Sequence, residues 1–247
     1  MLGSVKNAIN IINSFSIETP ELGICDIADR LEMNRSTVHH IVKSLSNEGI
    51  LVRTKSRRYR LGSQLLGWGQ TVTEQYKDYL MATPYIDSLV KRTQETVLLA
   101  ILENEEVCCL SKVEPNKAIS MNTKIGDRKP LHCSGAGKIL LAYQTEKSIK
   151  KVLSKKLIRK TNNTITDPNL LAEELKLIKK RGYAFDHGEY EENSSWIAVP
   201  IYNFLGDVTC SLSLSISKQT LNDVEAIKTV KNQLLLTSQN ISRHCDF

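Results

Sequence analysis

The sequence lacks a long apolar run. Its longest stretch without a charged residue, 193–206, contains Asn, Ser and Pro and is too short and too polar to span a bilayer. The apolar core of a secretory signal is also missing, because Asn7, Asn10 and Asn13 interrupt the apolar residues near the N-terminus. We therefore expect a cytoplasmic protein with no membrane partner.

Cysteine is present, but without the spacing of a metal site or a disulfide framework. The six cysteines form no CxxC pair and no cluster with histidine at zinc-ligand spacing. Adjacent residues of a strand point to opposite faces, so Cys108 and Cys109 would not share a metal. We expect reduced and mostly buried thiols, no metal and no cofactor.

Acidic residues are scarce in one window of the chain. Residues 35–60 contain seven Lys or Arg and one acid, Glu48, which gives a net charge of +6, equal to that of the whole chain. Residues 1–34 carry two basic and five acidic residues. A charge run is commonly just a solvated face, so its meaning depends on the scaffold that presents it.

The first 62 residues have the pattern of three helices and a hairpin. Apolar residues at spacings of three and four predict helices over 5–15, 24–31 and 34–49, where Asn34 would be the N-cap and Gly49 the C-terminal stop. Two β-like runs, 50–54 and 59–61, flank a basic turn. This order is typical of a winged helix-turn-helix domain, which we assign to residues 1–62.

In such a domain the third helix enters the major groove and the wing contacts phosphates. A protein-interaction module of the same fold is the alternative, but the basic excess falls on the two elements that would face DNA. Binding of single-stranded RNA would favour stacking aromatic residues, and Tyr59 is the only one in the window. The predicted contacts to double-stranded DNA are Arg35, Ser36, Thr37, His39, His40, Lys43, Lys55, Arg57 and Arg58.

Residues 63–80 predict a helix that links two domains. Leu65, Trp68, Val72 and Tyr76 recur at helical spacing and form an apolar face. We expect this face to contribute to a dimer, because DNA-binding domains of this kind commonly read two half-sites.

Residues 81–247 mix both kinds of secondary structure. Hairpin pairs followed by helices indicate an α+β domain, an antiparallel sheet flanked by helices. Strands are expected at 97–102, 107–113, 118–121, 183–190, 196–201 and 208–216, and helices at 84–93, 136–144, 146–153, 168–181 and 221–243, the last capped by Thr220.

Two segments of this domain have the chemistry of a binding site. Small residues within 131–138 open a helix, where free backbone N–H groups suit an anion. The segment lacks the phosphate-binding P-loop pattern, because Ile139 stands where Ser or Thr would hold magnesium. Alternation places Ser211, Ser213 and Ser215 on one face of a strand, which either lines a polar pocket or faces solvent.

The full pattern resembles the IclR family of bacterial transcription regulators. The resemblance is carried by residues 27–45, 131–138, 181–186 and the strand with Ser213 and Ser215. It implies a C-terminal effector domain of GAF-like fold, homodimers or dimers of dimers, and a response to a small organic acid, sugar acid or aromatic acid. We expect a regulator, a repressor rather than an activator, that binds an operator.

The resemblance also implies a ligand site. Gly135 and Ala136 would supply backbone amides, Asp186 would orient a ligand hydroxyl, and Met121 would form an apolar wall. Ser213 and Ser215 would supply hydroxyl groups. Where the family commonly has Gly and Cys, this chain has Asn193 and Trp196. The indole of Trp196 either forms one wall of the pocket or fills it and leaves no room for an effector.

Two other functions stay open at this point. An enzyme would need a nucleophile and a base, for which only His132, Cys133 and His187 are suitably placed, and structural roles are the commoner explanation of such residues. A redox- or metal-responsive regulator would use Cys108, Cys109 and Cys133.

Overall fold

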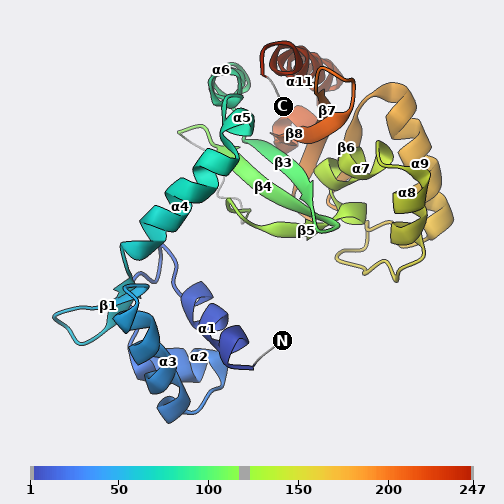
Figure 1. Cartoon of the computed structure of the whole chain (residues 1–247). Coiled ribbons are helices and arrows are strands. Elements are labelled where there is room, and N and C mark those ends of the chain that lie inside the picture. Colours follow the sequence, from blue (N-terminus) through green and yellow to red (C-terminus); the bar gives the residue numbers. More distant parts are fainter. Residues whose placement is uncertain (1–2, 117–122, 246–247) are drawn as a thin grey trace. The chain divides into compact units, whose positions relative to one another are not determined.

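The computed structural model describes residues 3–116 and 123–245 (Figure 1). It divides into two compact units, Met1–Tyr76 and Lys77–Phe247, which are treated separately below. Over the described ranges, no helix is both long and apolar enough to cross a membrane.

The first unit confirms the predicted order of three helices and a hairpin. Apolar side chains of the three helices bury a common core that includes Ile11, Ile27, Val38 and Val42. Tyr59 of the hairpin exchanges two backbone hydrogen bonds with Leu22, N···O 2.8 and 3.0 Å, which fastens the hairpin to the segment before the second helix. The elements are α1 (Gly3–Asn13), α2 (Ile24–Leu31), α3 (Arg35–Asn47), β1 (Leu51–Arg53) and β2 (Tyr59–Leu61).

Helix α3 ends as its sequence indicates. Gly49 adopts a φ of +69°, in the left-handed region that glycine tolerates, and the N–H of Ile50 donates to the carbonyl of Leu45 at 2.9 Å. Asn34 occupies the N-cap position with extended backbone, but its side chain makes no capping hydrogen bond.

The predicted linker helix is two helices, α4 (Gln64–Gln75) and α5 (Lys77–Leu80). The N–H of Tyr76 donates to the carbonyls of Val72 and Thr73, a tightened last turn that ends α4. The boundary between the two units falls at the same place, within the stretch that the sequence assigned to the linker.

The second unit contains a six-stranded sheet of order β5-β4-β3-β8-β7-β6, in which every recorded pairing is antiparallel. Helices α6 and α11 pack on one face, and α7 with its neighbours α8 and α9 on the other (Figure 1). This confirms the predicted α+β domain. The elements are α6 (Thr83–Thr93), β3 (Val97–Glu103), β4 (Glu106–Val113), β5 (Arg128–Pro130), the 3-10 turn η1 (Leu131–Cys133), α7 (Gly135–Ala142), α8 (Glu146–Leu153), α9 (Pro168–Arg181), β6 (Ala184–His187), β7 (Ser195–Tyr202), β8 (Val208–Ile216), α10 (Lys218–Leu221) and α11 (Val224–His244).

Two expectations for this unit need revision. The last helix is not capped by Thr220 and does not begin at Leu221: the carboxylate of Asp223 accepts hydrogen bonds from the N–H groups of Glu225 and Ala226 and caps α11, while Ser217 caps α10. The strand expected over 183–190 is only β6, because the chain turns at Gly188 with a φ of +73°. Strand β5 was not predicted, and the strand expected at 118–121 lies outside the described residues.

Candidate functional sites

Helix α3 presents a polar face to solvent. Its apolar stripe, Val38, Val42 and Leu45, is buried against the core, which forces the remaining positions outward. The side chains predicted to contact DNA are all exposed: Arg35, Ser36, Thr37, His39, His40 and Lys43.

The turn between β1 and β2, residues 55–58, is the wing. Lys55, Arg57 and Arg58 are exposed, but they differ in their partners. Arg58 donates to the carboxylate of Asp26 at 2.8 Å and to the carbonyl of Glu21 at 3.0 Å, whereas within 3–116 and 123–245 neither Lys55 nor Arg57 forms an ion pair. Arg57 has a φ of +61°, so its backbone conformation is one that glycine would adopt more easily.

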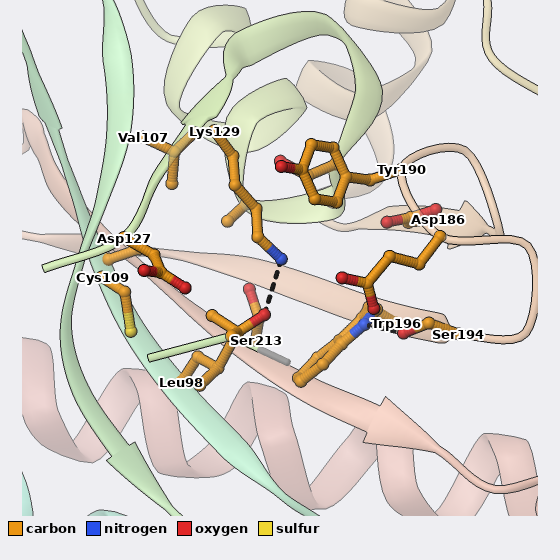
Figure 2. Close-up of a pocket in the computed structure, with 16 residues that line it drawn as sticks. Leu98, Val107, Cys109, Asp127, Lys129, Asp186, Tyr190, Ser194, Trp196 and Ser213 are labelled. Carbon is orange, nitrogen blue, oxygen red and sulfur yellow. Dashed lines mark hydrogen bonds between the residues drawn. The ribbon is translucent and has the colours of Figure 1, made fainter. Parts of the chain in front are cut away.

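A pocket lies between the sheet and the start of α7 (Figure 2). Its enclosed part has a cavity volume of about 40 Å³, and the empty space that includes its mouth is about 540 Å³. A water molecule needs roughly 10–15 Å³ on the first measure, so the interior is narrow but not filled. The pocket is lined by Leu98, Ala100, Val107, Cys109, Thr123, Asp127, Lys129, Ser134, Gly135, Ala136, Asp186, Tyr190, Glu191, Ser194, Trp196 and Ser213.

The N-terminus of α7 forms one end of the pocket. The hydroxyl of Ser134 accepts a hydrogen bond from the N–H of Gly137 at 3.1 Å, which leaves the N–H groups of Gly135 and Ala136 without an acceptor inside the helix. A Cβ at Gly135 would lie 3.2 Å from that of Ala198, so glycine allows the close approach of α7 to the sheet. Free amides at a helix N-terminus suit an anion, so the anion site stays a prediction for these two residues.

Asp186 lies beside this helix end and is buried. Its carboxylate accepts a hydrogen bond from the N–H of Glu189 at 2.8 Å. Burial raises the pKa of Asp186 to about 6, against the smaller effects of that hydrogen bond and of Lys138 and Lys129. Near neutral pH this carboxylate can accept a hydrogen bond from a ligand hydroxyl.

The serine face of β8 is buried, so it does not face solvent. The hydroxyl of Ser213 lines the pocket and has no hydrogen-bond partner, although it is buried. The hydroxyl of Ser215 bonds to the carboxylate of Glu95 at 2.9 Å and accepts from the N–H of Thr96 at 3.0 Å, and Ser215 is not among the residues that line the pocket. The structure thus brings only Ser213 of the predicted pair into the pocket.

Trp196 forms a wall and does not plug the cavity. Its indole N–H donates to the hydroxyl of Ser194 at 2.5 Å, and its ring packs with Leu98 and Cys109. Met121, the predicted apolar wall, lies outside the described residues.

Polar contacts hold residues 185–189, next to Asp186, in place. The ammonium of Lys138 is buried, donates to the carbonyl of Phe185 at 2.7 Å and forms an ion pair with Glu189. The carbonyl of Glu189 accepts from the hydroxyl of Thr164 at 2.7 Å. Burial raises the pKa of Glu189, while Lys138 acts in the opposite direction.

The sequence did not identify Lys129 or Tyr190 as pocket residues. Lys129 belongs to β5, and its ammonium lies 4.5 Å from the centre of the Tyr190 ring. The only sequence signal was the position of Lys129 two residues before the 131–138 segment. Tyr190 follows β6 in the turn that the sequence had assigned to a strand.

The three cysteines considered for a redox or metal site, Cys108, Cys109 and Cys133, are buried. Burial raises the pKa of Cys109 to about 11 and that of Cys133 to about 12, and it also raises the pKa of Cys108. A thiol with a raised pKa is a poor nucleophile and a poor metal ligand. The part of the chain that was described contains no group of His, Cys, Asp and Glu side chains able to hold a metal. His132 is buried and hydrogen-bonds to the carbonyl of Ile158 at 3.0 Å, a structural contact.

The chain combines a winged helix, a fold that DNA-binding proteins commonly use, with a helix-flanked antiparallel sheet that contains a pocket. Residues 4–55 match the family described as the IclR helix-turn-helix domain, and residues 72–243 match the bacterial transcriptional regulator IclR C-terminal family. The chain belongs to the IclR family of transcriptional regulators.

Similar proteins cover nearly the whole chain. The HTH-type transcriptional regulator XynR of Escherichia coli is 29% identical over 98% of this chain and 97% of its own. The crystal structure of the Thermotoga maritima IclR is 29% identical with a TM-score of 0.83 and full coverage of both chains. An IclR homolog from Microbacterium hydrocarbonoxydans, solved as a complex with 4-hydroxybenzoate, is 28% identical with a TM-score of 0.78 and covers 98% of this chain and 99% of that one.

Proposed function

We propose that this chain is an intracellular repressor, not an enzyme, that binds a double-stranded operator as a homodimer or dimer of dimers and responds to a small acid. The effector is an organic, sugar or aromatic acid with a hydroxyl group beside its carboxylate. That the protein represses transcription, and does not activate it, is inferred from the family resemblance. The observation that supports the ligand class is the pocket, where free amides of α7, the carboxylate of Asp186 and the unpartnered hydroxyl of Ser213 line one cavity.

Each group in the pocket suits one part of such a molecule. The amides of Gly135 and Ala136 favour a carboxylate, because the helix dipole is positive at that end. Asp186 would repel a bare anion but accepts a hydrogen bond from a hydroxyl. The 4-hydroxybenzoate in the Microbacterium homolog is an aromatic acid that carries a hydroxyl group, which supports a hydroxylated acid as effector, although its two groups are at opposite ends of the ring.

For DNA binding, the proposal assigns base contacts to α3 and phosphate contacts to the wing. Side chains near the start of α3 would contact base edges, so Thr37→Ala or His40→Ala should change which sequences bind, by roughly 1–3 kcal/mol per lost contact. Selection of genomic fragments by the full-length protein and its variants would test this. An unchanged preference in both variants would contradict the assignment.

Calorimetry with the full-length protein and a panel of hydroxylated acids tests the pocket. Ser213→Ala should weaken binding of the acid that wild type recognises by about 0.5–1.5 kcal/mol. Ser211→Ala is the matched control, because Ser211 lies on the same buried face, bonds to the carbonyl of Val199 and does not line the cavity. Equal binding by wild type and the Ser213 variant would show that the effector binds elsewhere. The acid that binds wild type should also release the protein from operator DNA.

A further inference from the structure

Lys129 gives the pocket a positive charge that the proposed function has not used. Its side chain runs from β5 into the cavity, and the ammonium lies among Tyr190, Trp196 and Ser213 (Figure 2). It donates to the hydroxyl of Thr123 at 2.6 Å and lies over the Tyr190 ring. Both partners are neutral groups.

The ammonium of Lys129 has no direct ion pair. Among the residues that the structure describes, none places a carboxylate within ion-pair distance of it. The acids of the cavity act on it from further away: Lys129 opposes the rise in the pKa of Asp186, whose carboxylate is bonded to the N–H of Glu189, and Asp127 accepts from the N–H of Lys124 at 2.6 Å. A half-buried ammonium without a hydrogen-bonded carboxylate can form a charge-assisted hydrogen bond with an anion, and such bonds are the stronger ones.

The cavity therefore has two places for an anion, the Lys129 ammonium and the amides of Gly135 and Ala136. The buried hydroxyl of Ser213, which has no partner, lines the same cavity. Asp127, Asp186 and Glu191 also line the cavity. These carboxylates would repel a dianion that lacks donors, but they can accept hydrogen bonds from ligand hydroxyl groups.

We propose that Lys129 is a specificity-determining residue and that the effector is a hydroxylated dicarboxylate. One carboxylate binds Lys129 and Thr123, the other binds the amides of Gly135 and Ala136, and a hydroxyl between them donates to Asp186. This inference rests on the proposed function, because it takes the same cavity as the effector site, and it narrows the class from acids in general to diacids.

The test compares acids that differ by one carboxylate, with the full-length protein in a calorimeter. Malate is paired with lactate and galactarate with galactonate. Wild type should bind at least one diacid roughly tenfold or more tightly than its matched monoacid, because one charge-assisted contact is lost. Lys129→Met keeps the length of the side chain, and it should abolish that preference while monoacid binding stays the same. Lys129→Arg should retain the preference.

The controls distinguish failure of the Lys129 inference from failure of the proposed acid-sensing function. Lys124→Met removes an exposed ammonium outside the cavity lining and should change nothing. Equal binding of diacid and monoacid by wild type would overturn the role of Lys129 and leave the acid-sensing function standing. A Lys129→Met variant that loses both acids alike, or neither, would also overturn it. Failure of every acid to bind wild type would overturn both proposals.

Discussion

The buried position of Asp186 determines the pH at which its carboxyl group ionises. Its carboxyl group is buried in the pocket, and the loss of water raises its pKa from 3.8 to about 6. Glu189, which is negative, acts in the same direction as burial, while Lys138 and Lys129 oppose it. Between these two pH values the folded protein binds more protons at Asp186 than the unfolded chain does. Stability contributed by this group is therefore highest below about pH 4 and is lost as the pH rises through about 6.

Asp186→Asn should remove that part of the pH dependence. The free energy of unfolding of wild type minus that of the variant should fall by up to about 3 kcal/mol as the pH rises from about 4 to above 6. Urea denaturation of both proteins across this range measures the difference. The other titratable groups are common to the two chains and cancel, so a flat difference would contradict the account of Asp186.

Alternation within one strand was enough to place Ser213 on a common face with Ser211, but it could not tell which members reach the pocket. That depends on partners from elsewhere in the chain, such as Glu95, which takes the hydroxyl of Ser215. Lys129 was missed for a related reason. It enters the site because β5 pairs with β4, with Val107 opposite Lys129, and three residues carry too weak a pattern to predict that pairing.

In the wing, Arg58 and Arg57 differ in how firmly the rest of the domain holds them. Arg58 is held by Asp26 and Glu21, and the hydroxyl groups of Thr54 and Ser56 contact the Glu21 carboxylate at 3.3 and 3.2 Å. The wing is thereby anchored to the loop before α2 and to α2 itself. Arg57 has no such anchor and remains available to a phosphate.

Arg57→Gly and Arg58→Gln should therefore have different effects on DNA binding. The glycine variant keeps the positive φ, loses one cation, and should shallow the dependence of affinity on salt by about one unit for all DNA sequences alike. In Arg58→Gln the salt slope should stay close to that of wild type, and protein stability should change by less than about 1 kcal/mol, because the ion pair is exposed. Fluorescence anisotropy with duplex DNA between about 50 and 200 mM salt would measure both slopes. Equal slopes in the two variants would contradict this division of roles.

Helices were predicted well where local signals agreed. The side chain of Asp167 caps α9, Pro168 opens it, and Gly182 ends it with a φ of +78°, all of which the sequence indicates directly. The start of α11 was misplaced because Thr220 and Asp223 are both good caps three residues apart. Only the path of the chain after β8 decides between them.

Contacts between segments that are far apart in the chain could not be predicted from the sequence. The hairpins β3–β4 and β7–β8 are close in sequence and were predictable from their patterns. The pairing of β3 with β8, which joins the two hairpins into one sheet and places Val97 opposite Leu214, has no local signal. The same pairing places Leu98 opposite Ser213 and so joins the β3–β4–β5 side of the pocket to the side that carries Asp186 and Ser213. The pocket could therefore be inferred from the family resemblance but not from the residues alone.

An apolar face of α4 is exposed in the single chain. Trp68 and Val72, four residues apart on the same side of the helix, are each 49% exposed. No residue of α4 is buried. Exposed apolar side chains that gather on one helix commonly mark an interface, and a two-fold interface uses the same patch on both copies.

We predict that this face holds a homodimer. Each buried side chain of this size stabilises an association by about 1.5–3 kcal/mol, and two-fold symmetry doubles the effect of one substitution. Trp68→Ser together with Val72→Ser should therefore convert a dimer into a monomer in sedimentation at micromolar concentration, whereas Gln70→Ala, an exposed change on the same helix, should not. The double variant should also lose its advantage on an operator with two half-sites and bind it no better than a single half-site. A wild-type protein that sediments as a monomer, or a double variant that remains dimeric, would show that α4 is not the interface.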